Sequence, residues 1–174
     1  AMRHGIYMLP ESRKEQGLLL KQPVRHNLSL PHLDLVTTPG GIIRNGTEGE
    51  RTGEMAQKMN VQPATTRSRV NNLSGGNQQK VLFGKWLFKQ PRLFIVDEPT
   101  RGIDVGAKQA IYELIVNLAS SGMAILLISS EMEEILGLAH RVMVMREGAI
   151  VTELSVTDNS LTEDNVMRAA FGTV

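Results

Sequence analysis

Two short stretches, Leu73–Lys80 and Leu93–Thr100, constrain this chain more than any other part of it. The first reads Leu-Ser-Gly-Gly-Asn-Gln-Gln-Lys and leads into an amphipathic run that predicts a helix over 76–89. The second is a continuous apolar run that ends in two adjacent carboxylates, Asp97 and Glu98. Such a run predicts a buried strand, and open α/β sheets place their ligand sites where strands end. The two stretches therefore predict an α/β sheet with a polar site at its carboxyl edge.

The rest of the chain alternates strand-like and helix-like segments. Strands are predicted over 5–9, 93–96, 124–128, 141–145 and 149–154, and helices over 76–89, 106–120, 131–138 and 161–171. The segment 124–128 is uniformly apolar, as expected for a strand that is covered on both faces. Short links between alternating strands and helices imply right-handed parallel crossovers. The predicted fold class is α/β with a mainly parallel sheet.

Residues 22–90 differ from this pattern. They include a polar, glycine-containing stretch with weak periodicity, and the composition over 48–59 favours a helix. We interpret 22–90 as a helical subdomain inserted into a single α/β core, which consists of 1–21 and 91–174. Because the chain begins in a strand-like segment, we expect 1–174 to be an internal piece that starts within a domain.

Composition excludes several classes of protein. The 174 residues carry 19 basic and 18 acidic side chains, and no basic patch of the kind that binds nucleic acid is concentrated in the sequence. Zero cysteines exclude disulfides and thiolate metal sites, and fit a reducing compartment. No apolar run reaches the roughly 20 residues that span a bilayer. If the protein works at a membrane, another polypeptide must span it.

The loop Ser74-Gly75-Gly76 precedes the predicted helix 76–89. A helix N-terminus presents free N–H groups and a positive dipole end, which favour phosphate. Glycine permits close approach of the backbone, and the Ser74 hydroxyl can donate to a phosphate oxygen. The alternative is an ordinary serine N-cap next to a Gly-Gly linker. The eight-residue series, with Gln78 behind the glycines, favours the phosphate interpretation.

Asp97 and Glu98 form the second candidate site. An aspartate at a strand end can hold Mg²⁺ directly or through water, and a glutamate beside it can polarise an attacking water molecule. The alternative is an acidic strand end that caps a nearby helix. Two adjacent carboxylates followed by Pro-Thr favour the catalytic interpretation.

Together these stretches resemble the signature and Walker B motifs of ABC-type ATPases, and 101–104 (Arg-Gly-Ile-Asp) resembles their D-loop. The resemblance is closer still to the second ATP-binding half of the fused, two-domain ATPases of bacterial sugar importers. It extends over four stretches, 10–18, 73–80, 97–108 and 128–137. Members of that group handle ribose, xylose, arabinose, galactosides or a sugar-like autoinducer. The resemblance implies a core like that of P-loop NTPases, with the helical insertion described above.

The chain departs from an ordinary ABC domain in three ways. It contains no G-x-x-x-x-G-K-[ST] phosphate loop, so the Walker A portion is absent. Glu11 stands where a glutamine is usual, and Ser130 stands where the γ-phosphate switch is usually a histidine. Serine has neither the charge nor the reach of an imidazole. The last two departures resemble the second half of the sugar importers, which lends its signature loop to ATP held by the first half and hydrolyses poorly itself.

The resemblance implies roles for individual residues, with ATP and Mg²⁺ as cofactors. The expected catalytic positions are Glu98 as the base, Asp97 as the metal ligand and Ser130 as a degenerate switch. The expected nucleotide-binding positions are Ser74, Gly75, Gly76, Gln78, Glu11 and Asp104, the last at the interface between halves. Without a phosphate loop, the isolated chain is expected neither to bind ATP usefully nor to hydrolyse it.

The resemblance also implies partners. These are an N-terminal ABC half or a second ABC subunit, a transmembrane permease and, indirectly, a periplasmic sugar-binding protein. The expected location is the cytoplasmic face of the inner membrane. The permease contact is expected within 24–72, with Asn27 and Leu30 on the docking face.

The sequence lacks features that other classes of ABC ATPase would need. A DNA-repair ATPase head would need long flanking coiled coils, and a translation factor would need a histidine at Ser130; a non-catalytic half that supplies only its signature motif remains open. The four histidines show no metal-ligand spacing and are expected at the surface or in caps. Arg13 and Lys14 are left open between a phosphate contact, a contact with a partner loop and simple solvation.

Overall fold

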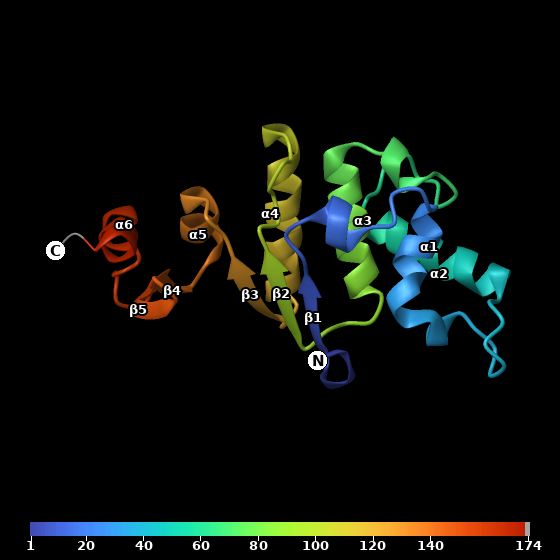
Figure 1. The fold of residues 1–174 in the computed structure, drawn as a ribbon, viewed down its shortest axis with the longest axis horizontal. Coiled ribbons are helices and arrows are strands. Elements are labelled where there is room, and N and C mark those ends of the chain that lie inside the picture. Colours follow the sequence, from blue (N-terminus) through green and yellow to red (C-terminus); the bar gives the residue numbers. More distant parts are fainter. Residues whose placement is uncertain (173–174) are drawn as a thin grey trace. The chain divides into compact units, whose positions relative to one another are not determined.

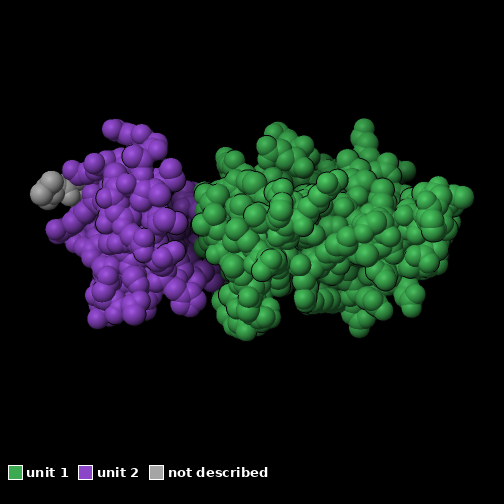
Figure 2. All heavy atoms as spheres, turned by 90° about the horizontal axis from the view of Figure 1, so that it is seen from below, with its two compact units in different colours: residues 1–128 green, residues 129–174 purple. Residues whose placement is uncertain are grey.

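A computed structural model describes residues 1–172, which form two compact units (Figures 1 and 2). Unit 1 is Ala1–Ile128, and unit 2 begins at Ser129. None of the helices described is long and apolar enough to cross a membrane. The prediction of a core over 1–21 and 91–174 with an inserted subdomain over 22–90 remains a prediction.

Unit 1 contains a three-stranded parallel sheet in the order β1-β2-β3. The strands are β1 (Ile6–Leu9), β2 (Leu93–Asp97) and β3 (Ala124–Ile128). The register pairs Leu9 with Val96, and Val96 with Leu127. Helical segments link the strands, and the parallel pairing confirms the predicted fold class.

Unit 1 also contains four α-helices, which are labelled in Figure 1. They are α1 (Val24–Ser29), α2 (Asn45–Lys58), α3 (Gly75–Leu87) and α4 (Val105–Ser120), with short helical turns at Met2–His4, Arg13–Gly17, Leu30–Leu35 and Val70–Asn72. Helix α3 is central: Phe83 packs edge-on against Phe94 of β2, with ring centroids 5.7 Å apart. A Cβ at Gly84 would lie 2.9 Å from a side-chain carbon of Leu28. Helix α3 therefore packs against both the sheet and α1.

The expectation that the strand 124–128 is covered on both faces is wrong. Burial alternates along β3, and Leu126 and Ile128 are 39% and 44% exposed. Met8 of β1, on the same sheet face as Leu126 through the β2 register, is 45% exposed. The opposite face contains buried Phe94 and Val96. A uniformly apolar strand thus has only one well-covered face in the described structure.

Unit 2 contains α5 (Met132–Leu138), the antiparallel hairpin β4 (Arg141–Arg146) and β5 (Ala149–Ser155), and α6 (Glu163–Phe171). The two-residue turn, Glu147 at φ 51° and Gly148 at φ 79°, has the positive angles of a type I′ hairpin turn. The small hydrophobic core of unit 2 consists of Val144, Leu154 and Val166. The predicted hairpin is confirmed. Helix α6 starts two residues later than predicted, because Thr162 is its N-cap.

Candidate functional site

The carboxyl ends of the three parallel strands lie at one edge of the sheet, where Asp97 and Glu98 leave β2. The Glu98 N–H donates to the carbonyl of Ile128 at 2.9 Å, so this backbone is tied to the end of β3. Glu98 has φ 45°, in the left-handed region that a glutamate rarely adopts. Backbone strain of this kind costs about 1–3 kcal/mol and is typical of functional sites.

Burial raises the pKa of the Asp97 carboxyl, and the neighbouring Glu98 carboxylate raises it further. A nearby cation would therefore be needed to favour the ionised form of Asp97. Among residues 1–172, no cluster of three or more His, Cys, Asp or Glu side chains forms a metal cage. Mg²⁺ at phosphate sites usually takes only one or two carboxylates, with water and phosphate oxygens completing its shell. A single half-buried aspartate at a strand end fits that ligand set.

Ser74 is exposed and is the N-cap of α3. Its Oγ accepts hydrogen bonds from the backbone N–H of Asn77 at 3.4 Å and from the side-chain amide of the same residue at 3.0 Å. The structure therefore contains the ordinary serine N-cap. In this cap the hydroxyl oxygen is the acceptor, so the cap does not use the hydroxyl hydrogen. A serine hydroxyl has one donor in addition to its acceptor sites. The first-turn N–H groups of Gly75 and Gly76 also have no partner inside the helix.

Packing within the protein also favours glycine at positions 75 and 76, which the sequence pattern did not indicate. A Cβ at Gly76 would lie 2.9 Å from the Cβ of Ala107, so its absence lets α3 and α4 approach at their N-terminal turns. A Cβ at Gly75 would lie 3.1 Å from a guanidinium nitrogen of Arg13. Both glycines therefore leave space for parts of this protein, in addition to any space for a ligand.

Gln78 was expected to bind nucleotide, but its side chain is buried and makes internal hydrogen bonds. Its amide nitrogen donates to the carbonyls of Val70 at 3.3 Å and Leu73 at 3.1 Å, and its amide oxygen accepts from Arg13 at 3.4 Å. Both amide hydrogens can be used within the protein in this arrangement. Gln78 therefore holds the loop that precedes Ser74.

The loop after β1 contacts the turn after β2 through two side chains. Glu11 forms an ion pair with Arg101. Arg13 donates to the carbonyls of Arg101 at 3.0 Å and Gly102 at 2.9 Å. Burial lowers the pKa of the Arg13 guanidinium. Of the three roles left open for Arg13, simple solvation is therefore wrong for the described structure.

Asp104 and Ser130 lie at element boundaries. The Asp104 carboxylate caps α4 by accepting from the backbone N–H of Ala107 at 3.0 Å, and its side chain is exposed. Ser130 is exposed and belongs to unit 2, just before α5. The expectation that the histidines lie at the surface or in caps is wrong for His32, which is 2% exposed and packs against Tyr7 with the ring planes tilted by 35° and the centroids 5.3 Å apart.

Comparison with known proteins gives one family and one fold. The family model described as ABC transporter matches residues 2–101. The chain is 46% identical over 172 residues to the ribose import ATP-binding protein RbsA of Geobacillus kaustophilus, covering 99% of this chain and 34% of that protein. It is 42% identical over 171 residues to the arabinose import ATP-binding protein AraG of Pectobacterium atrosepticum, covering 98% and 33%. The chain thus spans about a third of the length of these relatives.

Two solved structures share the fold. A nucleotide-free ATP-binding cassette from an ABC transporter matches with a TM-score of 0.71 and 21% identity, over 96% of this chain and 68% of that one. A dimeric post-hydrolysis cassette bound to ADP and Pi matches with a TM-score of 0.69 and 19% identity, over 87% and 62%. The fold is that of an ABC ATPase cassette. With a family model over more than half of its residues, the chain belongs to the ABC transporter family.

Proposed function

We propose that this chain is part of the ATP-hydrolysing subunit of an ABC importer for a sugar or a sugar-like solute. The observation that carries the proposal is the exposed N-terminus of α3, where Ser74 keeps a free hydroxyl hydrogen beside the N–H groups of Gly75 and Gly76. The relatives named for ribose and arabinose import support the substrate class.

Ser74, Gly75 and Gly76, the N-cap and first two residues of α3, are called the Ser74 loop below. The proposed role of the Ser74 loop is to bind the γ-phosphate of an ATP molecule that is held mainly by the other half of the transporter. The Ser74 hydroxyl and the first-turn N–H groups are donors in fixed positions, and such donors stabilise negative charge that develops on phosphoryl oxygens. Asp104 caps α4 close to the same region and is proposed to face the partner half. This half therefore supplies donors to a shared site.

The chain's own site is proposed to be weak. Asp97 would hold Mg²⁺, and bound Mg²⁺ would neutralise charge on the β- and γ-phosphate oxygens. Glu98 would orient the attacking water. Ser130 offers no imidazole to contact the γ-phosphate. Glu11 is paired with Arg101, which reduces its freedom to serve a ligand.

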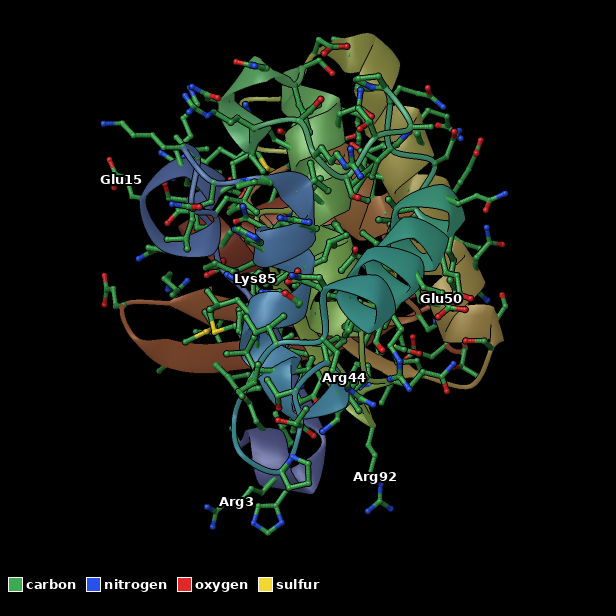
Figure 3. All side chains as sticks on the ribbon, turned by 90° about the vertical axis from the view of Figure 1, so that its right-hand side faces the viewer. Arg3, Glu15, Arg44, Glu50, Lys85 and Arg92 are labelled. Carbon is green, nitrogen blue, oxygen red and sulfur yellow. The ribbon has the colours of Figure 1, made fainter. Side chains whose placement is uncertain are left out.

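The proposed partners are a second ABC half and a transmembrane permease at the cytoplasmic face of the inner membrane. A groove along α2 is a suitable permease contact; it is lined by Thr47, Glu50, Arg51, Glu54, Met55, Lys58 and Phe88. Figure 3 shows Glu50 on the outer side of this helix. Asn27, which was expected on the docking face, is instead fully buried and bonded to the backbone of Leu19. Leu30 is 43% exposed, so its side chain is accessible to a partner, although it does not line this groove.

The proposal is tested by the ATP turnover of the full-length protein assembled with its permease. We expect Ser74→Arg to abolish nearly all turnover, because the arginine removes a donor and blocks the approach of phosphate to the loop. Losing one preorganised donor typically costs about 10²–10³ in rate. Glu98→Gln should slow turnover only modestly, because it belongs to the weak site.

The matched control is a pair of cap deletions. Ser74→Ala and Thr162→Ala each remove a hydroxyl that accepts from the backbone N–H three residues on, at 3.4 and 3.3 Å, so their losses of backbone capping energy should be similar; Ser74→Ala also removes the exposed bond from the Asn77 side chain. Only Ser74→Ala should lower turnover. Turnover that survives Ser74→Arg but is lost in Glu98→Gln would show that this half carries the working base. A wild-type assembly without ATP turnover would refute the proposed function itself.

A further inference from the structure

Arg13 joins three segments that lie far apart in the sequence. Its guanidinium donates to the carbonyls of Arg101 and Gly102 at 3.0 and 2.9 Å, and its Nε donates to the Gln78 side chain at 3.4 Å. The residues involved are 65 to 89 positions apart from Arg13. A guanidinium is a rigid planar fork, so it can donate to two neighbouring carbonyls at once, whereas an ammonium is a single point of charge.

Two glycines lie next to the Arg13 guanidinium. A Cβ at Gly75 would lie 3.1 Å from one terminal nitrogen, and a Cβ at Gly102 would lie 3.9 Å from the other. Gly102 also has φ 65°, a conformation that favours glycine. A side chain at Gly75 would therefore crowd the guanidinium, whereas at Gly102 the backbone conformation, rather than the space, disfavours a side chain.

The turn that carries Arg13 is attached to α3 at a second point. Lys85 of α3 is buried, and its Nζ donates to the carbonyl of Gly17 at 2.6 Å; Figure 3 shows Lys85 inside the fold. A Cβ at Gly17 would lie 2.9 Å from a methyl carbon of Leu82, so this turn packs directly on α3. The turn Arg13–Gly17 is thus linked to the beginning of α3 through Gln78 and to its later part through Lys85.

A second side chain of the loop after β1, Glu11, also contacts the turn after β2, because it forms an ion pair with Arg101. Two opposite charges from the loop after β1 thereby contact one short turn, whose far end is Asp104, the cap of α4. Within that turn the Arg101 N–H donates to the carbonyl of Glu98 at 3.2 Å, and the Ile103 N–H donates to the carbonyl of Thr100 at 3.1 Å. Its conformation depends on local bonds and on the contacts from Glu11 and Arg13.

We infer that Arg13 is a positioning residue that holds the Ser74 loop and the turn 98–104 in one fixed geometry relative to the loop after β1. The inference rests on the proposed function, in which Ser74 and Asp104 serve a site shared with the other half. Donors at such a site must be held within about 0.5 Å of their working positions. Arg13 supplies that constraint without contacting the nucleotide.

The kinetic test compares Arg13→Gln, Arg13→Lys and Lys14→Gln in the full-length protein assembled with its permease. Arg13→Gln should lower kcat about tenfold and leave the KM for ATP unchanged, because misplaced donors slow the reaction while the nucleotide is held elsewhere. Arg13→Lys should recover part of the loss, since one ammonium can reach only part of the carbonyl pair. Lys14→Gln removes an exposed neighbouring charge and should behave as wild type.

Hydrogen exchange of the same proteins gives a readout that needs no turnover. Arg13→Gln should speed exchange in both 73–79 and 98–104, with no change in α6, and Lys14→Gln should change neither segment. Arg13→Gln that matches Lys14→Gln in kcat and in exchange would overturn the inference. So would a loss of protection spread over the whole chain, because it would indicate general destabilisation. If the wild type has no ATP turnover, the proposed function fails while the exchange data still decide the role of Arg13.

Discussion

Replacing Gly76 with alanine tests whether the second glycine of the Ser74 loop is required for packing. The added Cβ would lie 2.9 Å from the Cβ of Ala107, and apart from the neighbouring residues and backbone of α3 itself it would meet no other heavy atom within 4 Å. Carbon atoms pack best at about 3.5–4.0 Å, so the N-terminal turns of α3 and α4 must separate by roughly half an ångström or more. The shift would act directly on Ser74, two residues earlier.

Two opposing effects set the magnitude. Overpacking of a well-packed contact typically costs about 1–3 kcal/mol. Alanine in a helix is favoured over glycine by at most about 1 kcal/mol, which offsets part of the cost. We therefore expect Gly76→Ala to lower the free energy of unfolding by about 0.5–2 kcal/mol. At about 2–4 °C per kcal/mol for a chain of this size, the Tm should fall by a few degrees.

Gly53→Ala is the matched control. Gly53 lies in α2 of the same unit, and a Cβ there would meet nothing within 4 Å. It should raise the Tm, because only the helix preference of alanine remains. The Tm of each variant, Gly76→Ala and Gly53→Ala, is measured by thermal unfolding followed by circular dichroism. The double variant Gly76→Ala/Ala107→Gly removes the clash and should be more stable than the two single effects predict. A Gly76→Ala protein as stable as Gly53→Ala would refute the packing argument.

Two further predictions concern stability. Because the pKa of Asp97 is raised in the folded protein, the folded state favours the protonated carboxyl, and stability should fall as pH rises from the unfolded value of 3.8 through the raised value. Without nucleotide, Asp97→Asn should therefore raise the Tm at pH 7, and the gain should vanish below pH 3.8; a gain independent of pH would contradict the burial argument. At the hairpin turn, Glu147→Asn should stabilise unit 2 by about 1 kcal/mol, because Asn tolerates the positive φ of 51° and Asn-Gly is the preferred type I′ pair. The stabilisation is measured as slower hydrogen exchange in β4 and β5, and unchanged or faster exchange in Glu147→Asn would contradict the turn assignment.

The sequence by itself determined the strands, most of the longer helices and how the first sheet is connected, but it did not indicate the short helix α1. The apolar runs 93–96 and 124–128 became β2 and β3, and helices between strands required parallel crossovers. It also identified Ser74 at the start of α3 and Asp97 at the end of β2. These features depend on neighbours within a few residues, so local pattern is sufficient to predict them.

Only the tertiary structure decided what several side chains do. The exposure of Leu126, the burial of His32, the internal bonds of Gln78 and the links made by Arg13 could not be read from local pattern. An apolar strand has the same sequence whether one or both of its faces are covered. Likewise, an arginine in a polar loop looks solvated until chain folding brings carbonyls from 88 and 89 residues away to its guanidinium. Such contacts depend on the packing of distant segments, which no short window of sequence contains.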